Sequence, residues 1–468
     1  MDLPKTIKET QEGLLEKKFT AVDLVDKYLS RIEKNKDLNA FITVTAETAY
    51  KQARHFDDSN DGSVKDFLKE HPLAGVVVAH KDLFLTKGVR TTAASRVLES
   101  YVPAYSATVV ERLEKAGCIM LGKTNCDAWA HGSSGENSDF GPTKNPVNPD
   151  YVPGGSSSGS AVAVAKDMAL VATGTDTGGS IRLPASFCGV VGLKPTYGAV
   201  SRYGIVAMAS SLDSVGHFGH TVEDVEGVFE VTKGEDGKDA TLRNTKYEIR
   251  NTKYEIRNTK LRIGIPKEYF VEGLDREVEK AVLSAIDVFK KEGVELVDVS
   301  LPHTKYANSA YYIIMPAEVS SNLGRYDGIR YGNSRETFGD EAKRRIMLGS
   351  YVLSAGYYDA YYLKAMKVRS KIIEDFDKAY DKVDAIIAPV SPTPPFKLGE
   401  KVSDPLTMYL ADIYTVAANL AGIPGLAIPS GFTKNKLPLG FQLMGPRFSE
   451  KTLFELGKIF ERKNAKRI

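Results

Sequence analysis

Cysteine is scarce in this 468-residue chain, which carries only Cys118, Cys126 and Cys188. Disulfide-stapled secreted proteins need several paired cysteines, so the composition excludes that class. We expect the three thiols to be reduced and the protein to be cytoplasmic. Apolar runs of membrane-spanning length are also missing, and the opening residues, MDLPKTIKETQEGLLEKK, are charged throughout. The sequence therefore predicts neither a membrane span nor a signal peptide.

An excess of charge of either sign is absent too, because 62 Lys and Arg stand against 60 Asp and Glu. Affinity for nucleic acid comes mainly from clustered Lys and Arg, so no large phosphate-binding face is expected in this chain. The seven histidines form no HExxH motif, and the cysteines form no CxxC motif. His217 and His220 have i, i+3 spacing, but the glycines of SVGHFGHTV favour a loop there. No metal site is expected.

The sequence does contain repeated alternation of extended and helical patterns. Residues 73–80 (LAGVVVAH) predict a buried strand, residues 105–116 predict a helix, and CIMLGKTN predicts the next strand. Later strand patterns are VVGLKPTYG, LRIGIP, DAIIAPV and GLAIP. This alternation predicts an α/β fold with a mostly parallel or mixed sheet.

No clean linker divides the chain, so we expect a single domain over residues 1–468 that opens with a helical segment at about 1–60. In that segment Thr20 and Asp23 form a plausible helix cap before an amphipathic pattern. Residues 243–260 (RNTKYEIRNTKYEIRNTK) are a near-perfect seven-residue repeat rich in charge. Apolar heptad positions are lacking, so this repeat predicts a surface insertion without a catalytic role.

Two Gly-Ser turns, GGSSSGS and DTGGS, lie within residues 152–189 and flank small apolar residues. Glycine allows positive φ and close approach of the backbone. Serine at such a turn supplies a hydroxyl, and the turn supplies free N–H donors, which is what a nucleophile and an oxyanion hole require. A flexible linker would not carry the core-like segments VAVA and MALVA between its turns.

Residues 155–159 (GSSSG) also match the G-x-S-x-G elbow of α/β-hydrolases. The elbow needs a preceding strand and a late histidine. Here the preceding NPVNPDYVP contains prolines that a central strand excludes, and His303 is the last histidine. Among cysteine nucleophiles, Cys118 and Cys188 are expected to be packed, and Cys126 is the hardest to dismiss. The scheme that remains is a serine with a lysine base.

Lys81 suits that scheme because it ends the apolar pattern LAGVVVAH and so lies at the mouth of a core. A lysine becomes a base when burial disfavours its ammonium form. The neighbouring Asp82 would oppose this by raising the pKa of Lys81, unless its carboxylate points elsewhere. A surface charge at the strand end is the alternative interpretation of Lys81.

These motifs together resemble the amidase signature family. The similarity rests on VVAHKDLFLTKGVRTTAAS, PGGSSSGSA and GTDTGGSIRLPASFCGVVGLKPTYG, with 24 positions from Ser156 to Ser180 as in that family. HGSSGENSDFGPTKNP and KRRIMLGSYVLSAGYYDAYY narrow the resemblance to the glutamine-hydrolysing subunits of tRNA-dependent amidotransferases. The resemblance implies an α/β/α sandwich whose central mixed, mostly parallel sheet is covered by helices.

The resemblance also implies a Lys–Ser–Ser triad. Ser180 would be the nucleophile, Ser156 would relay its proton from a cis peptide, and Lys81 would be the base. Ser157 would orient Lys81. The backbone N–H groups of the oxyanion hole would be those of Thr177, Gly178, Gly179 and Ser180.

For the amine and carboxylate of glutamine, the resemblance implies an Asp, an Arg and a Tyr. By motif these are Asp412, Arg345 and Tyr311, and the residue types suit a zwitterion. Arg344 competes with Arg345, and Tyr312 competes with Tyr311. The departures from the family include Ser158, where a positive φ would cost about 1 kcal/mol, and Leu183, often a Gln. The segment 332–339 also looks shortened, and SVGHFGHTVED replaces a more usual sequence.

The function implied is a glutaminase subunit that supplies ammonia for converting Glu-tRNA(Gln), Asp-tRNA(Asn) or both. It would hold no cofactor itself, and a partner subunit would use ATP and Mg²⁺. The expected partners are the B and C subunits of a heterotrimer, with misacylated tRNA held mainly by the B subunit. The alternative is a stand-alone amidase of the same family that acts on small amides.

Overall fold

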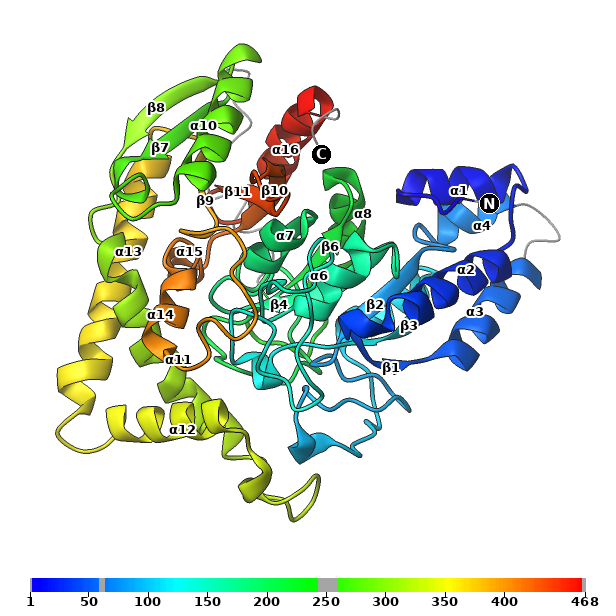
Figure 1. Cartoon of the computed structure of the whole chain (residues 1–468), viewed down its shortest axis with the longest axis horizontal. Helices are drawn as coiled ribbons and strands as arrows, with labels where there is room; N and C mark the ends of the chain where they lie inside the picture. The colour runs from blue at the N-terminus through cyan, green and yellow to red at the C-terminus, as the bar shows by residue number, and fades with distance from the viewer. Residues whose placement is uncertain (1, 59–63, 243–259, 465–468) are drawn as a thin grey trace.

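A long twisted sheet runs through the middle of the molecule with helices packed against both of its faces (Figure 1). The computed structural model describes residues 2–58, 64–242 and 260–464. In that part of the chain the sheet has eleven strands in the order β1-β3-β2-β4-β6-β5-β10-β11-β9-β7-β8. The strands are β1 Phe41–Val44, β2 Val77–Lys81, β3 Ile119–Thr124, β4 Val171–Asp176, β5 Val191–Lys194, β6 Ser214–Gly219, β7 Arg262–Pro266, β8 Glu295–Val299, β9 Ala385–Pro389, β10 Gly425–Phe432 and β11 Pro438–Met444.

Along the sequence, most of the helices come between two strands. They are α1 Ile7–Leu15, α2 Ala21–Lys34, α3 Ala46–Asp58, α4 Val64–Glu70, α5 Thr108–Lys115, α6 Ser158–Ala165, α7 Arg182–Cys188, α8 Val222–Thr232, α10 Arg276–Lys291, α11 Ala307–Leu323, α12 Asp340–Val352, α13 Lys364–Tyr380, α14 Pro405–Tyr409, α15 Val416–Ala421 and α16 Glu450–Asn464. None of the described helices combines the length and apolar content needed to cross a membrane.

The alternation of side chains along β11 shows how the two helical layers form. Phe441 packs edge-on against Phe289 of α10 and Phe460 of α16, with ring centroids 6.1 and 4.8 Å away. The next residue, Gln442, points the other way and accepts a hydrogen bond from Arg182 of α7. Successive strand residues face opposite sides of a sheet, so one strand is buried between two layers of helices. The predicted α/β sandwich is confirmed.

The balance of strand directions differs from the prediction. Six of the ten pairings in the described sheet are antiparallel, and four are parallel. The sheet is therefore mixed, but it is not mostly parallel. The reason is that β10 and β11 form a hairpin, while β6 runs antiparallel to both β4 and β5. Alternation in the sequence reveals elements but does not reveal which neighbours a strand chooses.

Most predicted elements are present with shifted ends. The strand expected at 73–80 begins at Val77, because Gly75 adopts φ 76° in a preceding turn. The helix expected from residue 105 begins at Thr108. Thr20 and Asp23 form the predicted capping box of α2. The N-terminal segment is helical as expected, but it also contains the short strand β1.

One expected loop is a strand. His217 lies in the middle of β6, buried, with Nε2 2.7 Å from Thr232 Oγ1. The glycines around it serve packing, because a Cβ at Gly216 would collide with the Leu193 carbonyl of the neighbouring strand β5. His220 contacts Asp167, with Nε2 3.3 Å from Oδ1. The two histidines therefore have different partners.

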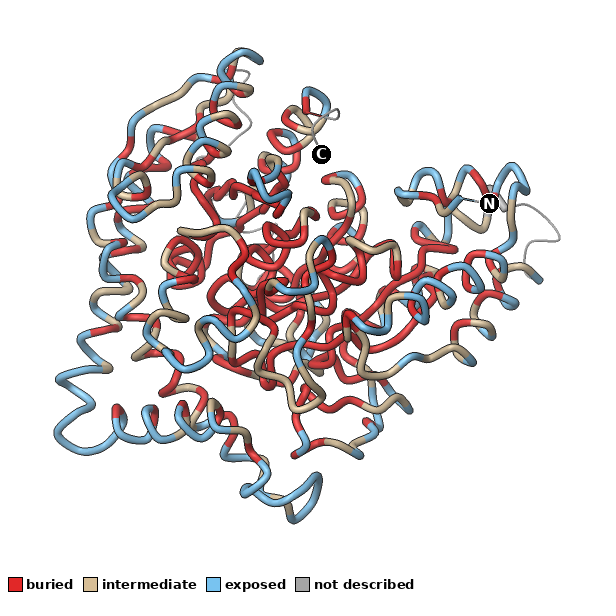
Figure 2. The backbone as a smooth tube through the Cα atoms, viewed as in Figure 1, coloured by how far each residue is buried: buried red, intermediate tan, exposed pale blue. Residues whose placement is uncertain are grey.

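The repeat at 243–260 lies outside the described residues except for Lys260, so its interpretation as an insertion stays a prediction. The single-domain organisation over 1–468 also stays a prediction, because several short segments of that range lie outside the described residues. Within the described residues, the buried positions concentrate around β2, β4, β6, α6 and α7 in the middle of the molecule (Figure 2). The residues singled out by the Gly-Ser turns lie in this centre.

Candidate active site

Lys81 is the last residue of β2, which lies between the parallel strands β3 and β4. Its side chain is fully buried. The ammonium nitrogen Nζ donates hydrogen bonds to Ser156 Oγ at 2.7 Å, Ser157 Oγ at 2.9 Å and Thr175 Oγ1 at 2.9 Å. Three hydroxyls thus surround a lysine that the sequence alone left as a possible surface charge.

Burial lowers the pKa of Lys81 to about 8. An ordinary lysine has a pKa of about 10.4, so the neutral amine of Lys81 is far more populated at neutral pH than that of an exposed lysine. Asp82 does not oppose this shift by contact, because its carboxylate points to Lys123, with Oδ1 3.2 Å from Nζ. The N–H and hydroxyl of Thr92 also donate to Asp82. The Asp82 carboxylate therefore points away from Lys81, although the two residues are adjacent in the sequence.

The two serines beside Lys81 have different hydrogen-bond roles. The Ser157 hydroxyl donates to the Thr175 carbonyl at 3.1 Å, so its own proton is already committed and it can only accept from Lys81. Ser156 Oγ has no hydrogen-bond partner other than Lys81 within the described residues. Of the two serines, Ser156 is therefore the one whose hydroxyl can give a proton to a neutral Lys81.

The turn that carries Ser156 rests on a buried carboxylate that the sequence did not single out. Asp127 accepts hydrogen bonds from the N–H groups of Gly135 at 3.1 Å and Asn137 at 2.9 Å, and its own N–H donates to the Ser156 carbonyl. A side chain at Gly155 would collide with the Asp127 carboxylate. The Gly155-Ser156 peptide bond is cis, as the resemblance implied. Burial raises the pKa of Asp127 to about 6.

Ser158 does not need a positive φ. It is the first residue of α6, and the positive φ of this turn, 76°, falls on Gly154. The Ser158 hydroxyl donates to Thr143 Oγ1 at 3.1 Å. Its departure from the family therefore carries none of the expected backbone cost. Leu183 is fully buried in α7, and nothing in the structure explains why it replaces Gln.

Ser180 lies in the turn between β4 and α7 and is 8% exposed. The N–H of Ser157 donates to the Ser180 carbonyl at 3.1 Å, so the two Gly-Ser turns are joined directly. The glycines before Ser180 are required by close neighbours. A Cβ at Gly178 would lie 2.7 Å from the Tyr311 hydroxyl oxygen, and Gly179 adopts φ 136° against Thr415.

One expected oxyanion-hole donor is already used. The N–H of Gly179 donates to Asp176 Oδ1 at 2.8 Å, so it is not free for a substrate oxygen. The N–H groups of Thr177, Gly178 and Ser180 have no acceptor among the described residues. The set of available donors is therefore smaller than the sequence suggested, because the side chain of Asp176 turns back onto its own loop.

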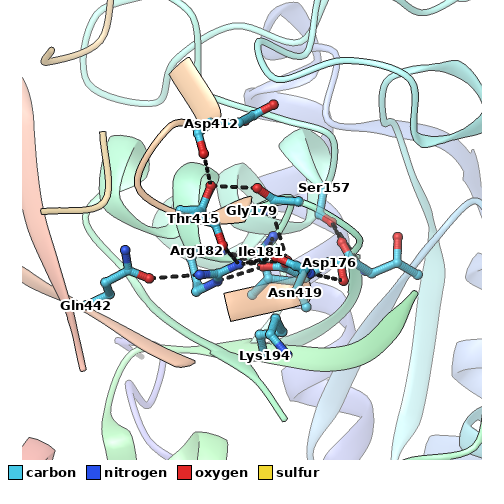
Figure 3. A network of polar contacts seen from close by, with 12 residues as sticks. Ser157, Asp176, Gly179, Ile181, Arg182, Lys194, Asp412, Thr415, Asn419 and Gln442 are labelled. Atoms are coloured by element: carbon cyan, nitrogen blue, oxygen red, sulfur yellow. Dashed lines mark hydrogen bonds and ion pairs between the residues drawn. The ribbon is translucent and has the colours of Figure 1, made fainter. Parts of the chain in front are cut away.

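Asp176 and Arg182 form a buried ion pair next to Gly179 and Ile181 of the turn (Figure 3). Both side chains are fully buried, and Arg182 Nε lies 3.1 Å from Asp176 Oδ2. Although burial acts to raise it, the guanidinium lowers the pKa of Asp176 to about 2. Arg182 also donates hydrogen bonds to three residues of the second half of the chain: Thr415, Asn419 and Gln442. Asp176 accepts a hydrogen bond from the side-chain amide of Asn419.

This network was missed at the sequence level. Its local signal is the spacing of an Asp four positions before Ser180 and an Arg two positions after it, in DTGGSIR. The partners in α15 and β11 lie more than 230 positions away, so no local pattern reveals them. Thr175 and Lys123 were also not singled out, and their partners Lys81 and Asp82 lie on another strand or at its end.

Asp412 is buried near the same turn. Its Oδ2 accepts hydrogen bonds from Ser133 at 2.8 Å and from the Tyr312 hydroxyl at 2.9 Å, while Oδ1 accepts none from the described residues. Burial raises the pKa of Asp412 to about 6. The structure gives both tyrosines a place: Tyr311 lies against Gly178, and Tyr312 binds Asp412.

The two arginines of KRRIMLG differ sharply in exposure. Arg345 is 4% exposed on the inner face of α12, with Nε 2.8 Å from Glu341 Oε1. The side chain of Arg344 is 42% exposed and pairs with the same glutamate. Of the two, Arg345 is the one that faces the protein interior.

The three cysteines are unsuited to nucleophilic catalysis. All three cysteines are free and buried, and burial raises the pKa of Cys126 to about 12. A thiol of that kind stays protonated and is a poor nucleophile. No group of three or more His, Cys, Asp or Glu that could hold a metal ion occurs among the described residues.

Comparisons with known proteins identify the family of this chain. The family model named Amidase matches residues 23–454. Two relatives, each described as the A subunit of glutamyl-tRNA(Gln) amidotransferase, are similar over nearly their whole length. The one from Carboxydothermus hydrogenoformans is 52% identical over 97% of this chain and 96% of its own. The one from Koribacter versatilis is 50% identical over 97% of this chain and 98% of its own.

Solved structures give the same picture. The crystal structure of the glutamyl-tRNA(Gln) amidotransferase A subunit from Thermotoga maritima superposes with a TM-score of 0.81 at 40% identity, covering 99% of this chain and 96% of that one. The peptide amidase from Stenotrophomonas maltophilia superposes equally well, with a TM-score of 0.81 at 28% identity over 99% and 97% of the two chains.

Proposed function

Since this chain belongs to the amidase family, we propose that it is a glutaminase that uses Lys81, Ser156 and Ser180. The ammonia released would serve a tRNA-dependent amidotransferase that converts Glu-tRNA(Gln), Asp-tRNA(Asn) or both. One observation carries the proposal. The fully buried Lys81 donates hydrogen bonds to Ser156 and Ser157, and the N–H of Ser157 donates a hydrogen bond to the Ser180 carbonyl.

The reaction starts with the neutral form of Lys81. The Ser180 hydroxyl oxygen attacks the side-chain amide carbon of glutamine, its proton passes to Ser156, and the Ser156 proton passes to Lys81 Nζ. A tetrahedral intermediate forms, its C–N bond breaks, and the nitrogen leaves as ammonia after taking a proton back along the same path. The product on the enzyme is a γ-glutamyl ester of Ser180. Water then attacks this ester through the same relay and releases glutamate.

The pKa of Lys81 decides whether this base is available. With a pKa of about 8, roughly one lysine in ten is neutral at pH 7. The Ser157 hydroxyl can only accept from Lys81, because its own proton is bonded to Thr175. Ser157 thus holds the lysine in place and leaves Ser156 as the proton path.

The oxyanion of the intermediate would be bound by the backbone N–H groups of Thr177, Gly178 and Ser180. Each such donor typically contributes about 3 kcal/mol to the transition state. The fourth N–H, from Gly179, has a supporting role because it holds the turn on Asp176. The ion pair of Asp176 with Arg182 keeps that turn rigid.

Glutamine is recognised by its two charges in this proposal. Asp412 offers Oδ1 to the ammonium group, and its other oxygen is fixed by Ser133 and Tyr312. Arg345 would bind the carboxylate, and Tyr311 would border the oxyanion turn beside Gly178. A buried carboxylate and a buried guanidinium at such a site favour a zwitterion over a plain amide.

The partner and cofactor roles extend this proposal. Relatives named as the A subunit of an amidotransferase support a complex with B and C subunits, in which a partner uses ATP and Mg²⁺ and holds the misacylated tRNA. The solved peptide amidase with the same fold keeps a stand-alone amidase as the second candidate.

Ammonia release from purified chain separates the two candidates. We expect hydrolysis of glutamine that rises when the B and C subunits are added and that is lost in Ser180→Ala. Partner-independent hydrolysis of simple amides, with no turnover of glutamine, would favour the stand-alone amidase. The same assay with Asp412→Asn and Arg345→Met should raise KM for glutamine while leaving the hydrolysis of a neutral amide unchanged.

A further inference from the structure

The corner of the molecule formed by α12 and the segment that follows it carries exposed aromatic side chains. Three tyrosines make a continuous strip: Tyr351 and Tyr357 have ring centroids 4.2 Å apart, and Tyr357 and Tyr361 have centroids 6.0 Å apart. They are 49%, 38% and 43% exposed. Figures 1 and 2 show this corner at the lower left, where the exposed chain of residues 353–361 projects beyond α12. We call residues 343–367 the α12 corner.

Aliphatic side chains extend the strip along α12. Met347 is 71% exposed and Leu348 is 42% exposed. With Tyr351 they recur at helical spacing, so they form one outward stripe. An exposed aromatic and aliphatic stripe of this kind marks an interaction site, because water solvates it poorly. The turn after α12 is also irregular, since Tyr358–Leu363 form a π-helix, a feature frequent at functional sites.

The edge of the corner carries an excess of positive charge, because four exposed basic residues stand against one exposed acidic residue, Asp359. Lys364 and Lys367 are exposed and have no acidic partner among the described residues, and Lys343 bonds only to the backbone carbonyl of Glu336. Arg344 is paired with Glu341 on the same helix. A surface with an apolar centre and an unpaired basic edge is complementary to apolar side chains flanked by carboxylates.

We propose that the α12 corner is the docking surface for a partner subunit, which covers it with a segment of apolar side chains flanked by Asp or Glu. This inference rests on the proposed function, since the partner is the rest of the amidotransferase. Tyr and Met are enriched in the buried centres of protein interfaces, whereas Met and Leu offer nothing to a stacking base. The composition of the stripe therefore favours a protein occupant over RNA.

The helix α12 connects the proposed docking surface to the proposed glutamine site. The outer face of α12 carries Met347 and Tyr351, and its inner face carries the buried Arg345. The helix packs closely on α11, because a Cβ at Gly349 would collide with the Pro316 carbonyl. A partner that fixes the outer face of α12 also fixes where Arg345 lies. Partner binding and glutamine binding are therefore coupled, each strengthening the other.

The test uses purified full-length chain with the purified B and C subunits of the same complex. The double variant Met347→Asp, Tyr351→Asp places two carboxylates in the stripe, and Lys364→Glu, Lys367→Glu reverses its edge. Leu283→Asp on α10 is the matched control, because Leu283 is a helical residue that is 45% exposed outside the corner. Thermal unfolding checks that each variant folds.

We expect each corner variant to weaken binding of the B and C subunits by about 30-fold, the effect of a loss of about 2 kcal/mol at an interface hot spot. The control should bind within about threefold of the wild type. Partner-stimulated glutamine hydrolysis should fall at low partner concentration and return when the partner is raised to saturation. KM for glutamine in the unsaturated mixture should be higher than in the saturated one.

Corner variants that bind and respond to the partners like the wild type would overturn the inference. Binding of deacylated tRNA by the chain alone, lost in the same variants, would also overturn it by assigning the surface to RNA. The proposed function is judged separately: if wild-type chain saturated with B and C subunits releases no ammonia from glutamine, that function fails, whatever the binding measurements give.

Discussion

The substitution Thr175→Val tests how the site controls the charge of Lys81. Thr175 Oγ1 is one of three hydroxyl oxygens that accept a hydrogen bond from the Lys81 ammonium, at 2.9 Å. Valine has nearly the same shape but accepts no hydrogen bond. The substitution therefore destabilises the charged form of Lys81 and leaves the proton path through Ser156 in place.

The expected size of the effect follows from the hydrogen bond. A hydrogen bond to a charged group contributes about 1.5–3 kcal/mol, and a neutral amine can recover part of such a contact. One pKa unit corresponds to about 1.4 kcal/mol. Since the pKa of Lys81 is about 8 in the native protein, we expect the pKa in the variant to be lower by about one unit.

The assay is kcat/KM for glutamine hydrolysis between pH 6 and pH 9.5, with the B and C subunits present. The active base is neutral Lys81, so the wild-type rate should rise about tenfold per pH unit below about pH 8 and then level off. In Thr175→Val the rising limb should move about one pH unit lower, which makes the variant relatively more active at pH 6.5. Asp412, whose pKa burial raises to about 6, adds the same acidic limb to both profiles.

Thr124→Val is the matched control for this experiment. Thr124 is also buried and is paired with Lys81 across β2 and β3, but its hydroxyl contacts Ser160 Oγ at 2.7 Å and makes no hydrogen bond to Lys81 Nζ. Its profile should keep the wild-type midpoint. An unshifted profile for Thr175→Val, or one displaced to higher pH, would refute the assignment of Lys81 as the base.

The other predictions concern the nucleophile, its support and the stability of the site. Ser180→Ala should reduce ammonia release by about 10³-fold or more without lowering Tm, and a rate near wild type would rule out the Ser180 ester. Arg182→Met should lower the free energy of unfolding by about 3–5 kcal/mol, because it leaves the Asp176 carboxylate buried without its cation; urea unfolding measures this, and an unchanged midpoint would count against it. Gly178→Ala should lower kcat by about 10²-fold, because the added methyl group would collide with Tyr311 and displace the turn. Full activity would show that Tyr311 can move aside without displacing the turn. The pKa of Lys81 is lower in the folded chain than in the unfolded one, so the unfolded chain binds more protons between about pH 8 and 10.5, and the free energy of unfolding should gain a contribution that rises with pH in this window. Lys81→Met should remove that contribution, which a comparison of urea midpoints at pH 8 and pH 10 would detect.

The elements of the fold were largely readable from local patterns, but the strand pairings were not. The apolar runs near Val77 and Ile386 lie where strands were expected, and the Thr20 cap starts α2. The antiparallel half of the sheet was missed because pairing depends on residues far apart in the chain. The glycines that flank His217 predict a loop because glycine usually weakens strands, whereas in β6 they allow a neighbouring strand to approach closely.

At the site, the residues that carry distinctive local motifs could be named from the sequence, and the residues that support them could not. Lys81 and Ser156 lie 75 positions apart, and the structure places their polar atoms at 2.7 Å. Asp127 and Arg182 are single charged residues without a motif of their own, so nothing local separates them from surface charges. Both are fully buried, and Arg182 in addition binds Thr415, which lies 233 positions away.

The sequence by itself determined the local features from which a serine–lysine chemistry is predicted: a lysine at the end of an apolar strand and two turns rich in Gly and Ser. Only the tertiary structure decided which atoms meet. It turned Asp82 away from Lys81 toward Lys123, gave the Ser157 proton to the Thr175 carbonyl, and bound the Gly179 N–H to Asp176. The physical reason is that turns and apolar runs are set by short-range sterics and burial, whereas the pKa of a lysine and the path of a proton depend on desolvation and on hydrogen bonds from several strands at once.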